Sequence, residues 1–181
     1  MILDTIVGIS TAHALGAIGI VRLSGSDAIK IANTLFSKDL KTIDSHHVVY
    51  GNIHDPTTSE WIDEVMLTQF KAPRSYTKED IVEISCHGGV MSTSKIMGLC
   101  ISLGARSAHP GEFTQRAVIH GRIDLAQAEG VNDLIHASSS QAMTMALKAM
   151  SGDVRRLIEP LIEDLIAIIA HIEVNIDYPE Y

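Results

Sequence analysis

The spacing of apolar residues changes near Asp124, and this change constrains the fold more than any other feature of the chain. Before it, runs rich in Val, Ile and Thr that suit strands are mixed with segments that suit helices. After it, apolar residues recur only at helical spacing. The change predicts an α+β domain with a mixed sheet, residues 1–118, followed by an all-α segment of long helices, residues 119–181.

Five segments of the first region are predicted strands and two are predicted helices. The strands are bounded by Gly, Pro, Asn or Asp and comprise residues 4–9, 17–24, 47–53, 63–70 and 80–87. The first helix, residues 27–36, opens on a Ser-Asp pair that can cap it. The second, residues 90–103, ends at Gly104, which can adopt the left-handed conformation common at helix ends.

The segment 110–129 joins the two regions and contains an ordered series of helix signals. A Pro-Gly pair breaks the preceding strand, a short helix follows, and Gly121 ends that helix. Asp124, with Gln127 three residues later, predicts a capping box at the start of the next helix. The segment also carries two cations whose role the local pattern does not explain.

Three helices are expected beyond this junction. The first covers residues 124–137, and Ser138 with Gln141 predicts a capping box for the second. The third covers residues 153–175 and contains Pro160, which would kink it or mark a helix start. Its apolar stripe is wider than a single partner requires, which suggests partners outside this segment.

The composition is that of an acidic globular protein. Apolar residues make up 46% of the 181 residues, which suffices for a packed core. Lys and Arg number 14 against 22 Asp and Glu, for a net charge of −8, and no Lys/Arg cluster is present. Extended binding to a nucleic-acid backbone by this chain alone is therefore disfavoured.

The sequence contains no signal for secretion or for a membrane. Its start lacks a basic segment followed by a long apolar one, and Cys86 and Cys100 are too few for a disulfide framework. The longest apolar run, residues 161–172, is interrupted by ionisable residues and is shorter than the roughly 20 residues that cross a bilayer. A cytoplasmic location follows by default.

Common catalytic and nucleotide-binding motifs do not occur in the sequence. Neither G-x-x-x-x-G-K-[ST] nor a G-x-G-x-x-G that opens a helix is present, which excludes a phosphate loop within these residues. The nine histidines show neither H-E-x-x-H nor a pairing with Cys-x-x-Cys, so no metal site is expected. G-x-S-x-G is missing, and both cysteines lie in segments whose pattern favours burial. No catalytic residue is assigned.

Two charged residues stand out within predicted strands. Glu83 lies in mid-strand among apolar neighbours, so its carboxylate must either face water or receive donors from a partner. Arg22 emerges from a row of isoleucines near a strand end, where spacing alone favours a guanidinium that simply extends to solvent. Two glycines, residues 88–89, follow His87 and permit positive φ or the close approach of another group.

Seven segments, in order, resemble the N-terminal part of the tRNA-modification GTPase family MnmE, also called TrmE. They are residues 4–7 (DTIV), 19–25 (GIVRLSG), 75–80 (SYTKED), Glu83 with 87–89 (HGG), 110–117 (PGEFTQRA), 124–129 (DLAQAE) and 176–179 (IDYP). Any one of them could arise by chance. The ordered set spans essentially the whole chain and is highly specific.

The resemblance implies a folate-binding and dimerisation domain, residues 1–118, similar to that of the glycine-cleavage aminomethyltransferases, and the start of a helical domain. Family folate contacts correspond to Arg22, Glu83 and Arg122, the last of which is usually Lys in the family. Glu83 can accept the pterin amine and ring N–H, whereas the two arginines suit the anionic glutamate tail or a one-carbon group's oxygen. Which arginine meets which group stays open, and Arg116 is expected to be structural.

The resemblance also implies cofactors and partners. In the family, a GTPase domain that uses GTP, Mg²⁺ and K⁺ is inserted beyond these helices, and C-terminal helices supply the partners of the apolar stripe. The family acts as a homodimer joined through the N-terminal domain and pairs with the flavoprotein MnmG. Together they add an aminomethyl-type group to C5 of the wobble uridine (U34) of certain tRNAs, with 5,10-methylene-tetrahydrofolate as the carbon source.

Three functions are weighed on this basis. The leading one is the tetrahydrofolate-binding and dimerising part of such a GTPase, which would hold the 5-formyl or the 5,10-methylene form. The second is a stand-alone folate-dependent aminomethyl- or formyl-transferase, which would not need the helical tail. The third is a dimerisation scaffold without a ligand.

Overall fold

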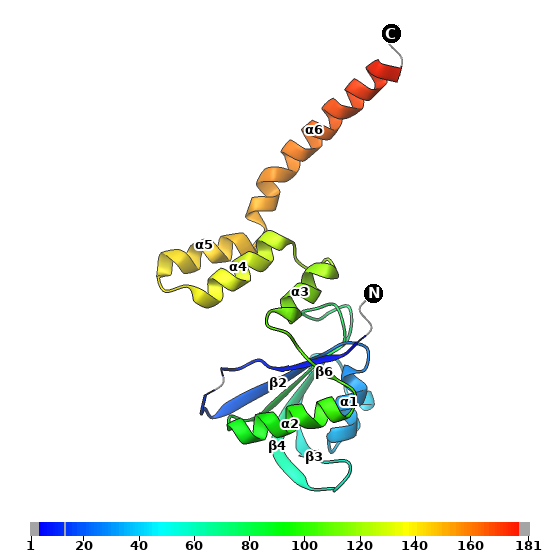
Figure 1. Ribbon diagram of the computed structural model, residues 1–181, viewed down its shortest axis with the longest axis vertical. Coiled ribbons are helices and arrows are strands. Elements are labelled where there is room, and N and C mark those ends of the chain that lie inside the picture. The colour runs from blue at the N-terminus through cyan, green and yellow to red at the C-terminus, as the bar shows by residue number, and fades with distance from the viewer. Residues whose placement is uncertain (1–3, 13, 178–181) are drawn as a thin grey trace. The chain divides into compact units, whose positions relative to one another are not determined.

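The computed structural model describes residues 4–12 and 14–177 (Figure 1). The chain divides into two compact units, residues 1–122 and residues 123–181. The first contains a mixed six-stranded sheet with helices, and the second is helical. The predicted fold class is thereby confirmed. In the motif at 176–179, Tyr178 and Pro179 lie outside the described residues.

The sheet has the strand order β3-β4-β5-β2-β1-β6. Neighbouring strands are antiparallel except β1 and β6, which are parallel. The strands are β1 (Ile6–Ile9), β2 (Ile18–Ser24), β3 (Val48–His54), β4 (Trp61–Phe70), β5 (Ile81–His87) and β6 (Arg106–Ser107). All five predicted strands are present, whereas β6 was implied only by the Pro-Gly break that follows it, because it is too short to carry an alternating pattern. The order brings β2 and β5 together, although the chain between them is long.

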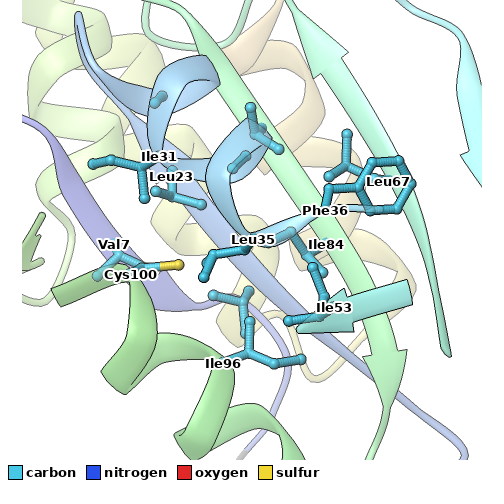
Figure 2. Close-up of a cluster of buried hydrophobic side chains, with 14 of the residues drawn as sticks. Val7, Leu23, Ile31, Leu35, Phe36, Ile53, Leu67, Ile84, Ile96 and Cys100 are labelled. Atoms are coloured by element: carbon cyan, nitrogen blue, oxygen red, sulfur yellow. The ribbon is translucent and has the colours of Figure 1, made fainter. Parts of the chain in front are cut away.

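Two helices, α1 (Ala28–Leu35) and α2 (Val90–Ser102), pack with one face of the sheet to form the main hydrophobic core. Figure 2 shows Leu35 of α1 and Ile96 of α2 gathered with Ile84 of β5. A 3₁₀ turn, η1 (Leu40–Thr42), adds one more buried leucine. Both cysteines are buried in this core, as predicted, and burial raises the pKa of the Cys100 thiol to about 12. Neither thiol is therefore suited to act as a nucleophile.

The opposite face of the sheet is covered at one end and open at the other. The loop before β5 and the helix α3 (Glu112–Ile119) lie over the covered end, where Ser24 Oγ of β2 is 2.7 Å from Thr77 Oγ1. At the open end, the large apolar side chains of Ile18 and Met66 are exposed. A site on this face can therefore combine buried support with access for a ligand.

The glycine at residue 88 is required by the close approach of another backbone segment, as its place after β5 had suggested. A Cβ at Gly88 would clash with the carbonyl oxygen of Gly16. Gly88→Ala is expected to lower the free energy of unfolding by about 1–3 kcal/mol, because two backbone segments must move apart. Urea denaturation followed by circular dichroism measures this loss.

A glycine in the middle of α2 provides the matched control. A Cβ at Gly98 would meet nothing within 4 Å. Gly98→Ala should therefore stabilise the chain by about 0.5–1 kcal/mol through its higher helix propensity. Equal effects of the two substitutions would show that the contact at Gly88 is not what constrains this turn.

The second unit consists of α4 (Leu125–His136), α5 (Ser140–Met150) and α6 (Asp153–Asp177). The capping box of α4 is present as predicted: Asp124 accepts the backbone N–H of Gln127, and Gln127 accepts that of Asp124. The predicted cap of α5 is wrong by one residue. Ser139, in extended conformation, accepts the N–H of Ala142 in place of Ser138.

The helix α6 runs through Pro160, so this residue does not begin a new helix. Its apolar stripe is exposed along its length, at Leu157, Ile158, Leu161, Ile162, Leu165, Ile166, Ile168, Ile169 and Ile172. An exposed apolar surface of this extent is characteristic of an interaction site. Among the described residues, no helix is both long enough and apolar enough to cross a bilayer.

Candidate ligand-binding site

Arg22 and Glu83 lie directly opposite each other on the neighbouring strands β2 and β5. Arg22 Nε donates to Glu83 Oε1 at 2.8 Å, and Nη2 lies 2.7 Å from the same oxygen. The two side chains are 27% and 25% exposed. The expectation that Arg22 extends alone to solvent is therefore wrong, because strand pairing gives it a carboxylate partner. Glu83 likewise receives its donors from Arg22.

The second oxygen of Glu83 is available to a ligand. Within the part of the chain that the structure describes, Oε2 accepts no hydrogen bond. An ionised carboxylate has about four acceptor sites, and Arg22 uses only those of Oε1. The pair can therefore accept N–H groups of a planar ligand while the arginine holds the carboxylate in place.

Two aromatic rings flank the guanidinium of Arg22. Its Cζ lies 5.5 Å from the ring centre of Phe113 and 5.9 Å from that of Tyr76. Phe113 comes from α3 and packs against β1 at Gly8, where an added Cβ would lie 3.3 Å from the ring. The absence of a side chain at Gly8 thus leaves room for the ring beside the ion pair.

Arg122 follows directly on Gly121, whose φ of 64° ends α3. Its guanidinium carbon lies 4.8 Å from the ring centre of Tyr76. The guanidinium carbon of Arg22 lies 5.9 Å from the same ring, so that Tyr76 links Arg122 to the Arg22–Glu83 pair. A planar guanidinium can stack on a ring in this way, which distinguishes Arg from Lys at such a contact.

Tyr76 is a site residue that sequence reasoning missed. It lies in one of the family-like segments, SYTKED, and its hydroxyl is 3.0 Å from Thr114 Oγ1 of α3. An aromatic residue in a polar loop was the available signal. Its importance depends on its contacts with Arg22 and Arg122, which only the folded chain brings together.

An open hollow of about 450 Å³ adjoins Tyr76 and Arg122. It is lined by His46, Phe70, Pro73, Arg74, Ser75, Tyr76, Lys78 and Arg122. The lining contains aromatic and cationic side chains and no carboxylate. Such a surface favours a ligand with both planar apolar groups and negative charge.

Arg116, the other cation of the junction, is fully buried and holds the domain together. Its guanidinium donates to Asp4, Glu79 and Glu112. Hydrogen bonds from Arg106, with further donors from the His109 N–H and Arg116, lower the pKa of Glu112 to about 2. Arg116 is therefore enclosed in an ion-pair network, and its side chain has no exposed surface.

His87 makes a separate polar contact at the far end of β5. Its backbone N–H donates to Asp63, and its Nδ1 lies 2.6 Å from Asp63 Oδ1. Ser92 donates to the same carboxylate. The hydrogen bond to Asp63 raises the pKa of His87 above its ordinary value. In residues 4–12 and 14–177, no three His, Cys, Asp or Glu side chains gather in a way that could hold a metal ion.

The chain thus consists of an α+β domain, whose mixed sheet carries an arginine–carboxylate pair near two aromatic rings, and a helical unit that follows it in the sequence. Two family models match the chain in the same order: the GTP-binding protein TrmE N-terminus over residues 5–122, and the MnmE helical domain over residues 125–181. The chain belongs to the MnmE (TrmE) family of tRNA modification GTPases.

Relatives in three bacteria support this assignment. The chain is 52% identical to the tRNA modification GTPase MnmE of Ligilactobacillus salivarius over 179 residues. It is 51% identical to the proteins of the same name from Levilactobacillus brevis and Oceanobacillus iheyensis. In each case the match covers 98% of this chain and 39% of the relative. The chain thus spans well under half the length of the relatives it matches.

Proposed function

We propose that this chain is the tetrahydrofolate-binding and dimerising part of a tRNA-modification GTPase. The observation that carries the proposal is the Arg22–Glu83 ion pair, in which Glu83 Oε2 accepts no hydrogen bond from the described residues, together with the Tyr76 ring near both Arg22 and Arg122. This arrangement suits a ligand with a donor-rich ring and an anionic tail. Membership of the MnmE family makes a reduced folate the ligand to test first.

In the proposed complex, Glu83 accepts the amine and ring N–H of the pterin, and the rings of Tyr76 and Phe113 border the planar part of the ligand. The two arginines meet the anionic tail or the oxygen of a one-carbon group. The bound form is 5-formyl- or 5,10-methylene-tetrahydrofolate. The folate supplies the one-carbon unit, and the residues of this chain bind and orient it.

The complete protein, on this proposal, hydrolyses GTP with Mg²⁺ and K⁺ in a domain outside this chain. As a homodimer and with MnmG, it forms the aminomethyl-type modification at C5 of U34 in certain tRNAs, in the cytoplasm. Residues 1–118 provide folate binding and dimerisation, and residues 119–181 begin the helical domain. The exposed apolar stripe of α6 supports this division, because further helices of the same domain would cover it.

Titration of 5-formyltetrahydrofolate into the chain by calorimetry tests the proposal. Saturable heat at one site per chain is expected. No heat would contradict both folate-based functions and leave the dimerisation scaffold. An assay of one-carbon transfer by the chain alone separates the remaining two, since a stand-alone transferase would turn over and a folate-binding part would not.

Arg22→Ala should weaken folate binding by about 1.5–3 kcal/mol, since it removes a charged donor and leaves Glu83 without its partner. The measurement is the dissociation constant by calorimetry. Arg155→Ala is the control, because that arginine lies on α6 in an exposed pair with Glu159. An unchanged constant for Arg22→Ala would return this residue to a purely structural role.

A further inference from the structure

Three cationic side chains line the hollow beside Tyr76. Arg74, Lys78 and Arg122 line it, and the described part of the chain places no Asp or Glu oxygen within 4.0 Å of any of the three. Lys78 Nζ donates to the carbonyl oxygen of Gly121 at 2.9 Å, which holds the ammonium next to Arg122. The three charges therefore belong to one surface.

This arrangement is unusual for so acidic a chain. Acidic residues exceed basic ones by eight, and five of the seven arginines have a carboxylate within 4.0 Å. The two arginines for which the described residues supply no such carboxylate, Arg74 and Arg122, both line the hollow. Like charges gathered without counter-charges repel each other, and a bound anion would relieve this repulsion.

The hollow continues from the proposed folate site. Tyr76 borders both, because its ring centre lies 5.9 Å from the guanidinium carbon of Arg22 and the residue also lines the hollow with Arg122. Phe70 and Pro73 add an apolar floor, and His46 packs edge-on against Phe70 with ring centres 5.1 Å apart. A volume of about 450 Å³ accommodates more than one amino-acid residue of a ligand.

We propose that this hollow binds the γ-linked polyglutamate tail of a folate, with Arg74 and Lys78 contacting carboxylates beyond the first glutamate. The inference rests on the proposed folate function and extends it to the class of folate that the chain prefers. Each added γ-glutamyl unit brings one carboxylate. An exposed cation binds each of these carboxylates only weakly. The gain in affinity for a long tail is therefore the sum of several weak contacts, and it decreases as the salt concentration rises.

Calorimetry with 5-formyltetrahydrofolate that carries one or five glutamates tests this inference. At about 20 mM NaCl the pentaglutamate should bind about tenfold more tightly than the monoglutamate, and at about 200 mM NaCl the difference should shrink. In the double variant Arg74→Gln/Lys78→Gln the two forms should bind equally. Gln keeps a side-chain donor for the Gly121 carbonyl, so the loop geometry is retained.

The matched control is Lys38→Gln/Lys41→Gln, which removes two exposed charges outside the hollow and should keep the tenfold preference. Equal affinity of the native chain for both tails, or a preference that survives in Arg74→Gln/Lys78→Gln, would overturn the inference. Loss of tRNA binding in that variant with the tail preference unchanged would also overturn it and assign the cations to nucleic acid. Binding of neither folate would instead remove the proposed function itself.

Discussion

Glu83→Ala is expected to abolish measurable binding of 5-formyltetrahydrofolate while the chain still folds and dimerises. Truncating one partner of a hydrogen-bonded charge pair in a binding site costs about 2–5 kcal/mol, and 3 kcal/mol already weakens a dissociation constant by more than a hundredfold. Glu83→Ala removes two favourable contributions to binding. The ligand N–H groups lose their acceptor, and Arg22 loses the carboxylate that orients it.

The fold should tolerate this substitution. Glu83 lies on the partly open face of the sheet, and the hydrophobic core lies on the other face. Its strand remains paired through the backbone with β2 and β4. Circular dichroism and sedimentation should therefore give the parent result for folding and for association, and calorimetry should show the loss of binding.

Glu64→Ala is the matched control for Glu83→Ala. Glu64 lies on the same face, on β4, but it accepts a hydrogen bond from the Tyr50 hydroxyl and contacts no arginine among the described residues. The variant Glu64→Ala should bind folate with the parent dissociation constant. If Glu83→Ala also bound like the parent, the assignment of the pterin to this carboxylate would be wrong.

Arg116→Met should lower the free energy of unfolding by about 3–5 kcal/mol. The guanidinium is fully buried and donates to Asp4, Glu79 and Glu112. Without it, these carboxylates remain close together with one charge fewer to neutralise them. The removal is costly because Glu79 and Glu112, which are 12% and 8% exposed, lose compensation for their charge but stay largely away from water.

Urea denaturation with a probe in the first unit measures the effect of Arg116→Met. Lys95→Met is the control, since Lys95 also forms an ion pair, 2.9 Å from Glu60, but both side chains are exposed. Exposed pairs contribute roughly 0–1 kcal/mol, so this variant should remain close to the parent. Similar losses for the two variants would mean that burial does not set the strength of the Arg116 network.

Much of the fold was predictable because the strands are half buried. Alternation along the strand predicted that Glu83 lies on one face of the sheet and that Val82 and Ile84 lie on the other face. The structure buries Val82 and Ile84 in the core. Helix ends were predictable where a side chain makes the cap, as at Asp124. The cap of α5 was not, because three serines follow one another and backbone conformation selects Ser139.

The candidate site was only half predictable. Sequence reasoning singled out Arg22, Glu83 and Arg122, but local spacing favoured an Arg22 that extends to solvent. The pairing of β2 with β5 joins residues 61 positions apart in the chain. A local sequence pattern cannot predict which residues of two such distant strands face each other. Tyr76 was missed for the same reason, because its two arginines come from different segments.

The sequence by itself determined the family, the α+β class and the change to helices near Asp124, because apolar periodicity and the order of motifs are properties of the linear sequence. Only the tertiary structure decided which charges are paired and which are free. Strand register gave Arg22 its carboxylate, burial made Arg116 structural, and the turn after α3 left Arg122 beside Tyr76 and the hollow. The physical reason is that an ion pair depends on distance in space, and only folding brings distant parts of the chain within 4 Å.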